Sequence, residues 1–147
     1  MAENEGISRN QTVDAGIDAR LQTKLIAETI AELEGCQSFA GWVRDQDLQY
    51  ILRRSGLQTL FVPTNEAFRV PVSGDPEEII NRHLLSGAWE SFDLSRTRAV
   101  ENRNGEVLPV SEGGTEVGGA RIVRADVPCT NGVIHVVGAD LQPVSAS

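Results

Sequence analysis

The chain holds few of the residues from which disulfide scaffolds, metal centres and active sites are built. Its 147 residues include two cysteines, Cys36 and Cys129, and two histidines, His83 and His135. Two cysteines are too few for a disulfide framework in a domain of this size, and their spacing matches no zinc or Cys-x-x-Cys motif. We expect both to be buried as small apolar residues, and a Cys36–Cys129 disulfide is the alternative that the sequence leaves open.

Basic residues and long apolar runs are also scarce. There are 13 lysines and arginines against 21 aspartates and glutamates, so the net charge is −8. An acidic surface repels nucleic-acid phosphates and anionic membrane surfaces, and we therefore expect neither as a partner. No apolar run approaches the roughly 20 residues of a membrane span, so we expect no direct membrane insertion.

The start of the chain leaves its cellular location open. Residues 1–6 are polar and acidic, without the basic and apolar regions of a signal peptide. The natural protein is therefore cytoplasmic, or this chain is a mature domain from which an export signal was removed. The length predicts one domain. We expect a flexible lead-in over residues 1–20, the domain over 21–144 and a tail over 145–147.

Helical patterns dominate the first half of the chain. Apolar residues recur at helical spacing over residues 21–34, and a second helix is expected to begin at a Ser38 cap. A third short helical turn is expected around residues 48–52. Asp75 and Pro76 predict the cap and first turn of another helix, which we expect to continue to about Ser86, with Glu78 completing a capping box.

Strand patterns dominate the second half. Before them, Leu57–Val62 predicts a strand that is buried on both faces. Asn104-Gly105 predicts a tight hairpin between strands near residues 98–101 and 106–110. Short strands follow near residues 115–117, 120–125 and 132–137, and no helix is expected after Trp89. Helices followed by a meander of strands predict an α+β domain.

Two segments resemble the signatures of the fasciclin-like (fasciclin I) domain family. Residues 59–68 read Thr-Leu-Phe-Val-Pro-Thr-Asn-Glu-Ala-Phe, and residues 131–137 read Asn-Gly-Val-Ile-His-Val-Val, with Leu141 and Pro143 following. The resemblance implies a single compact β-wedge of short strands flanked by several helices. The signature positions, for which it implies structural roles, are Thr59, Phe61, Pro63, Thr64, Asn65, Phe68, Asn131, Gly132, Ile134 and His135.

The residues themselves suggest why the signatures hold a fold. Pro63 has no N–H to donate to a ladder, so it marks the end of a strand. We expect Asn65 to satisfy free backbone donors at a short helix that follows it, through Phe68. Asn131-Gly132 predicts a turn before the final strand. His135 lies within an apolar strand, which predicts a buried imidazole fixed by hydrogen bonds.

The resemblance also implies a role in adhesion to cells, matrix or glycans, and a secreted or cell-surface location. The family's Tyr-His pair is represented here by Arg82 and His83, so the tyrosine is missing. The family's Asp-Ile pair after the first signature is absent, because Arg69 follows Phe68. We therefore expect a non-enzymatic module that binds a surface or matrix protein or a glycan. The candidate contact residues are Arg82, His83, Trp89 and Phe92.

Two alternatives come from other functional classes. One is a small hydrolase or metal-dependent enzyme that uses His83, His135 and Cys129. The sequence has no phosphate loop, no nucleophile elbow and no dinucleotide fingerprint, and zinc normally requires three or four protein ligands. We therefore expect no catalytic residues, no metal and no cofactor. The other alternative is a purely structural module of a larger assembly.

Overall fold

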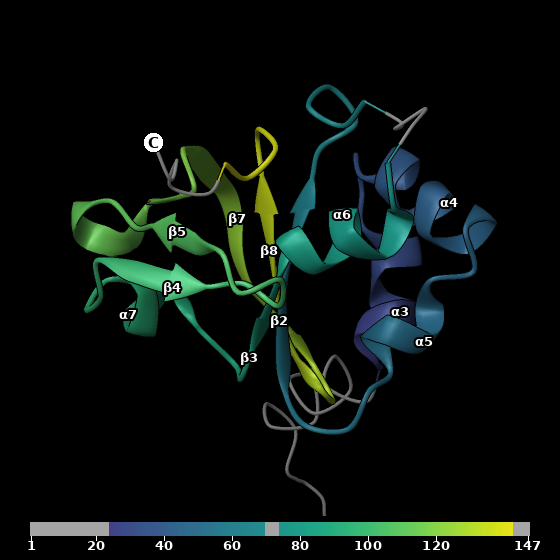
Figure 1. Ribbon diagram of the computed structural model, residues 1–147, viewed down its shortest axis with the longest axis horizontal. Helices are drawn as coiled ribbons and strands as arrows, with labels where there is room; N and C mark the ends of the chain where they lie inside the picture. The colour runs from purple at the N-terminus through teal and green to yellow at the C-terminus, as the bar shows by residue number, and fades with distance from the viewer. Residues whose placement is uncertain (1–23, 70–73, 143–147) are drawn as a thin grey trace, which may run out of the picture.

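A central sheet separates a helical side of the molecule from a side that carries a β-hairpin (Figure 1). The computed structural model describes residues 24–69 and 74–142. The lead-in expected over residues 1–20 and the tail expected over 145–147 lie outside these residues. Within the described ranges, no helix has both the length and the apolar composition needed to cross a membrane.

The main sheet has five strands in the spatial order β3-β2-β8-β7-β6. Their bounds are Gln58–Pro63 for β2, Leu84–Ser86 for β3, Glu116–Val117 for β6, Ala120–Cys129 for β7 and Gly132–Val137 for β8. Strands β2 and β8 run parallel, with Gln58 opposite Gly132 and Pro63 opposite Val137, and the other pairs are antiparallel. The two signature segments therefore lie side by side at the centre of the sheet.

The remaining elements flank this sheet. Among the described residues, four α-helices lie on one side: α3 (Ile26–Thr29), α4 (Gln37–Asp45), α5 (Gln49–Leu52) and α6 (Pro76–Arg82), with the 3-10 turn η1 (Ile30–Glu32) after α3. The hairpin of β4 (Ala99–Glu101) and β5 (Val107–Pro109) lies on the other side with α7 (Ser91–Leu94) and η2 (Glu112–Gly114). The prediction of an α+β fold of short strands flanked by several helices is confirmed.

The sheet has a hydrophobic core on each face. Leu60 and Val62 of β2 pack among the helices, whereas Phe61 between them packs on the hairpin side. All six residues of β2 are buried, which confirms the prediction of a strand buried on both faces. Cys36 and Cys129 are free, buried thiols on the helical side, so the disulfide alternative is wrong in this structure.

Several local predictions are confirmed. Asp75 caps α6, since its side chain accepts a hydrogen bond from Glu77 N, and Pro76 occupies the first turn. In this helix, which lies within the described residues, the Glu78 side chain makes no return hydrogen bond to the backbone of Asp75, so the expected capping box is not formed. The hairpin turn at Asn104-Gly105 is present, and Gly105 has a φ of 82° that suits glycine.

Other local predictions are wrong at element ends. The helix after Asp75 stops at Arg82, because the next residues form β3 and pair with β2; Leu84 lies opposite Leu60. The helix α7 was not expected after Trp89. The helix predicted over residues 21–34 is described only from residue 24, and it narrows to a 3-10 turn at Ile30.

Candidate functional site

His135 ties three parts of the hairpin side together. Its imidazole is fully buried and stacks on Phe61, with 5.5 Å between the ring centroids. Nδ1 accepts a hydrogen bond from Asp126 N at 3.2 Å, so Nε2 carries the proton and donates to Trp89 O at 2.6 Å. Burial lowers the pKa of His135, an effect that the hydrogen bond to the Trp89 carbonyl partly opposes. The ring is therefore a neutral structural bridge with both nitrogens in use.

The polar groups around His135 continue this connection. Thr59 Oγ1 donates to Gly87 O and accepts from Trp89 N, each at 2.7 Å. Asp126 has a φ of 62°, and its carboxylate accepts hydrogen bonds from the backbone N–H and the hydroxyl of Ser91. Thr59 and His135, both signature residues, thus hold the Trp89 segment and the start of α7 against the sheet.

The two signature asparagines cap helices that lie far away in the sequence. Asn65 Oδ1 accepts from Ser38 N at 2.8 Å, at the start of α4. Asn131 Oδ1 accepts from Ile26 N at 2.9 Å, at the start of α3, while its Nδ2 donates to Leu52 O at the same distance. The predictions that Ser38 caps its own helix and that Asn65 caps a following one are therefore wrong. In each case a tertiary contact supplies the cap.

Gly132 allows the close approach of the central strands. A Cβ built on this residue would lie 1.7 Å from Gln58 O, so a side chain cannot be accommodated without backbone movement. Asn131 O accepts from Gln58 N at 3.0 Å just before this contact. Asn131 and Gly132 together set the register in which β8 meets β2.

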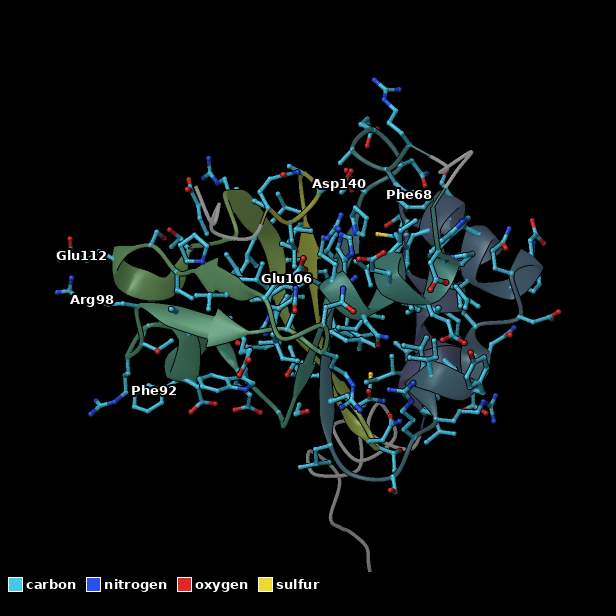
Figure 2. All side chains as sticks on the ribbon, in the orientation of Figure 1. Phe68, Phe92, Arg98, Glu106, Glu112 and Asp140 are labelled. Carbon is cyan, nitrogen blue, oxygen red and sulfur yellow. The ribbon has the colours of Figure 1, made fainter. Side chains whose placement is uncertain are left out.

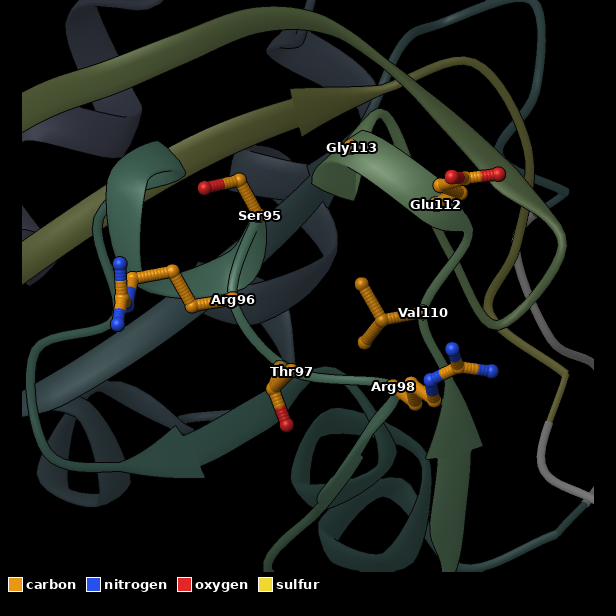
Figure 3. Close-up of a pocket in the computed structure, with 7 residues that line it drawn as sticks. All are labelled: Ser95, Arg96, Thr97, Arg98, Val110, Glu112 and Gly113. Atoms are coloured by element: carbon orange, nitrogen blue, oxygen red, sulfur yellow. The ribbon is translucent and has the colours of Figure 1, made fainter.

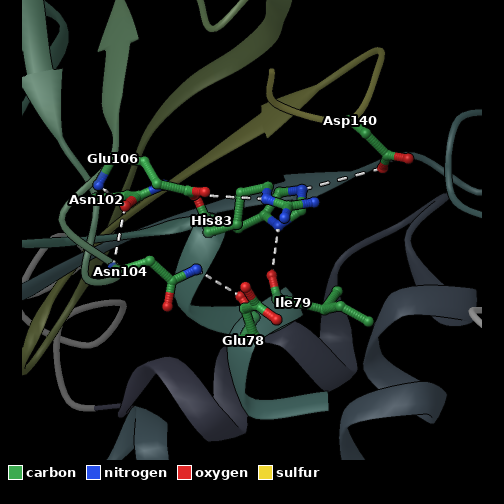
Figure 4. Close-up of polar contacts among 8 residues, drawn as sticks. Glu78, Ile79, His83, Asn102, Asn104, Glu106 and Asp140 are labelled. Atoms are coloured by element: carbon green, nitrogen blue, oxygen red, sulfur yellow. Dashed lines mark hydrogen bonds and ion pairs between the residues drawn. The ribbon is translucent and has the colours of Figure 1, made fainter. Parts of the chain in front are cut away.

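The second histidine, His83, lies on the helical side of the sheet, directly after the end of α6 (Figure 4). It is 2% exposed and packs near Phe39. Nδ1 lies 3.1 Å from Ile79 O and must donate to it, so the unprotonated Nε2 faces Asp140 Oδ1 across 4.0 Å. Burial lowers the pKa of His83, against weaker opposing effects of the Ile79 carbonyl and the Asp140 carboxylate.

The hairpin turn docks on α6 beside His83 through Asn104, which the sequence marked only as a turn residue, and through Asn102, which it did not single out. Asn102 is 4% exposed; its Nδ2 donates to Arg82 O and Glu106 Oε1, and its Oδ1 accepts from the backbone of the turn. Asn104 Nδ2 donates to Glu78 O at 2.8 Å (Figure 4). The Asn-x-Asn-Gly spacing is the sequence signal for this turn, but nothing in it indicates α6 as the partner.

The structure does not bring the three residues of the alternative enzyme site together. His83 belongs to the core on the helical face and His135 to the core on the hairpin face, so the sheet lies between them. Cys129 packs on the helical face, and burial raises the pKa of its thiol. Within residues 24–69 and 74–142, no three His, Cys, Asp or Glu side chains are grouped so as to hold a metal ion. The alternative that combines His83, His135 and Cys129 is therefore wrong.

The four candidate contact residues differ in their access to a partner. Phe92 projects from α7 at the hairpin end of the molecule and is 67% exposed (Figure 2). Trp89 is partly buried, and its Nε1 donates to Ser86 O. Arg82 is partly buried beside Glu106, with 3.6 Å between Nε and Oε1. His83 lies beneath the surface, so Phe92 is the most accessible of the four.

A cleft opens near Phe92, between the segment after α7 and η2 (Figure 3). Its volume is about 490 Å³, and Arg96, Arg98, Val110 and Glu112 contribute to its lining. A second, smaller pocket of about 180 Å³ lies over His83 and Asp140. Sequence reasoning singled out neither, because each brings together residues from separate elements.

Comparisons with known proteins agree with this architecture. The family model described as Fasciclin domain matches residues 34–143. Among solved structures, the chain is similar to a FAS1 domain pair from the insect cell adhesion molecule fasciclin I, with a TM-score of 0.64 and 16% sequence identity. That alignment covers 99% of this chain and 57% of the insect chain, and it shows a shared fold.

Sequence relatives include bacterial and animal proteins. Protein sll1483 of Synechocystis sp. is 29% identical over 157 residues, which cover 97% of this chain and 86% of that protein. Transforming growth factor-beta-induced protein ig-h3 of Sus scrofa is 32% identical over 81% of this chain, but this is only 20% of its own length. Periostin of Homo sapiens is 29% identical over 82% of this chain and 16% of its own length. The family model covers well over half of the sequence, and this protein therefore belongs to the Fasciclin domain family.

Proposed function

We propose that this chain is a non-enzymatic binding module that mediates adhesion or surface interaction through contacts with a protein or a glycan. The observation that carries the proposal is that His135 serves as a structural residue. Both of its nitrogens are bonded and its ring is fully buried. A general base must come within hydrogen-bond reach of the proton that it abstracts, and a buried ring with both nitrogens bonded to the protein backbone is not placed to do so.

Similarity to an insect cell adhesion molecule supports the adhesion role, and a secreted or cell-surface location accords with it. The animal relatives are several times longer than this chain, so their own activities extend beyond the shared domain. The candidate contact residues in this proposal are Phe92 and the exposed parts of Trp89 and Arg82. His83 would act indirectly, by holding the end of α6 in place.

An array of matrix proteins and glycans tests the proposal. We expect the folded protein to bind at least one component, and Phe92→Ser to weaken that binding while the melting temperature stays unchanged. Tyr50→Ser is the matched control, because Tyr50 is an exposed aromatic on the helical side, with 52% of its surface accessible. If the wild-type protein bound no component of the array, the proposal would be contradicted, and hydrolysis of any member of a substrate panel by the wild-type protein would also contradict it.

A further inference from the structure

Close backbone contacts form the walls of the cleft near Phe92. Gly114 has a φ of 74°, and a Cβ on it would lie 2.6 Å from Ser95 N, so η2 packs directly on the end of α7. Val110 N donates to Arg98 O at 2.8 Å and fixes the opposite wall. The volume of about 490 Å³ lies within the range of small-molecule sites in proteins. The cleft is therefore formed by backbone packing and does not depend on a ligand for its shape.

The charge of the cleft is opposite to that of the whole chain. Arg96 and Arg98 line it together with one acidic residue, Glu112, whereas the chain carries a net charge of −8. Arg98 forms no ion pair with any described residue, and Arg96 lies 5.5 Å from the centroid of the Phe92 ring. Guanidinium groups bind carboxylate and sulfate oxygens through paired N–H donors. Figure 3 shows Arg96 and Arg98 pointing to opposite sides of the cleft, so the two guanidinium groups suit separate anionic groups of one ligand.

Hydroxyl oxygens accompany the arginines. Ser95 and Thr97 line the cleft, and each hydroxyl donates its proton to a nearby carbonyl, Phe92 O and Ala99 O respectively. The hydroxyl oxygens therefore retain lone pairs that accept hydrogen bonds. A ligand that complements this lining carries both an anionic group and hydroxyl donors. The exposed ring of Phe92 lies beside Arg96, outside the lining itself.

We propose that this cleft binds an acidic saccharide, with Arg96 and Arg98 on separate carboxylate or sulfate groups along its chain and its hydroxyl groups on Ser95 and Thr97. The assignment rests on the proposed function and names the chemistry of one partner. A nucleic acid suits the cleft poorly, because its closely spaced phosphates would meet the acidic surface around two arginines. An acidic peptide supplies carboxylates but lacks the dense hydroxyl donors of a sugar.

Binding of four polymers to the wild-type protein tests the assignment, using oligogalacturonate, dextran sulfate, neutral dextran and poly-glutamate. We expect one or both acidic saccharides to bind, with an affinity that falls as salt rises. Neutral dextran and poly-glutamate are expected to bind more weakly. The preferred acidic saccharide identifies the anionic group as carboxylate or sulfate.

Variants locate the site. Arg98→Gln is expected to weaken saccharide binding about tenfold, the effect of losing a hydrogen bond to a charged group. Glu112→Gln should strengthen binding, because it removes the negative charge from the lining. Arg44→Gln is the matched control; it removes the same charge from a side chain of α4 that is 70% exposed, and we expect no change.

The possible failures are distinct. Equal binding by wild type and Arg98→Gln, or an equal loss with Arg44→Gln, would overturn the assignment to this cleft. Poly-glutamate that binds as well as the saccharides would overturn the saccharide assignment. If no saccharide binds while a matrix protein still does, this inference fails and the proposed function stands.

Discussion

Replacing His135 with alanine tests the central claim that this residue holds the fold. The imidazole is fully buried, and its two hydrogen bonds join β8 to Asp126 on β7 and to Trp89 before α7. Each lost hydrogen bond costs about 1 kcal/mol. The cavity left by the ring adds about 2 kcal/mol, somewhat less than for a buried phenylalanine. The expected loss is therefore about 4 kcal/mol in the free energy of unfolding.

This loss is a large share of the roughly 5–15 kcal/mol that stabilises an ordinary domain. For a chain of this length it corresponds to a fall of about 12 °C in melting temperature. Calorimetry or circular dichroism measures the shift, and urea unfolding gives the free energy. Phe92→Ala is the control, because this exposed side chain is expected to change stability by less than about 0.5 kcal/mol.

His135→Phe separates the two contributions. It keeps a ring against Phe61 but leaves Asp126 N and Trp89 O without their partner, so we expect it to remain about 2 kcal/mol less stable than wild type. A melting temperature of His135→Ala within about 2 °C of wild type would refute the reasoning. Full recovery in His135→Phe would show that packing alone, and not the hydrogen-bonded bridge, is what matters.

Three further predictions concern stability. Burial lowers the pKa of His83 and of His135 in the folded protein. Below the ordinary histidine pKa of about 6.5, the unfolded chain therefore binds more protons than the folded protein does. The stability that the neutral histidines contribute is complete above that pH and is lost as the pH falls below it. Melting temperatures measured from pH 7 to 5 should therefore decline, and the decline should be less steep in His135→Phe. Gly132→Ala should cost at least about 3 kcal/mol through its clash with Gln58 O, whereas Gly119→Ala, with open space around its Cβ, should cost about 1 kcal/mol in urea unfolding. Asn131→Ala should cost about 2 kcal/mol by the same measurement, and an effect below about 0.5 kcal/mol would contradict its capping role.

The central strands were predictable from the sequence because their signals are local. Leu60, Phe61 and Val62 form an unbroken apolar run, which is typical of a strand covered on both faces, and Pro63 ends it. Of the two aromatic candidates for contact with a partner, Phe92 is exposed and Trp89 is partly buried.

The partners of the polar residues were not predictable, because they are set by tertiary contacts. Asn65 has the side chain of a helix cap, but its acceptor oxygen serves Ser38, on an earlier helix. Leu84 continues a helical spacing of apolar residues, yet pairing with β2 makes it a strand residue. The cleft at Arg98 exists only because Gly114 lets two distant turns meet, and neither turn carries a periodic signal of its own.

The parallel pairing of β2 with β8 has a consequence for biosynthesis. Position 58 finds its neighbour at position 132, so the middle of the sheet stays incomplete until nearly all of the domain has left the ribosome. Contacts between such distant segments slow folding, because a large loop must close before they form. The apolar β2 segment would meanwhile be open to chaperones, and a nascent chain arrested before residue 132 should remain sensitive to protease.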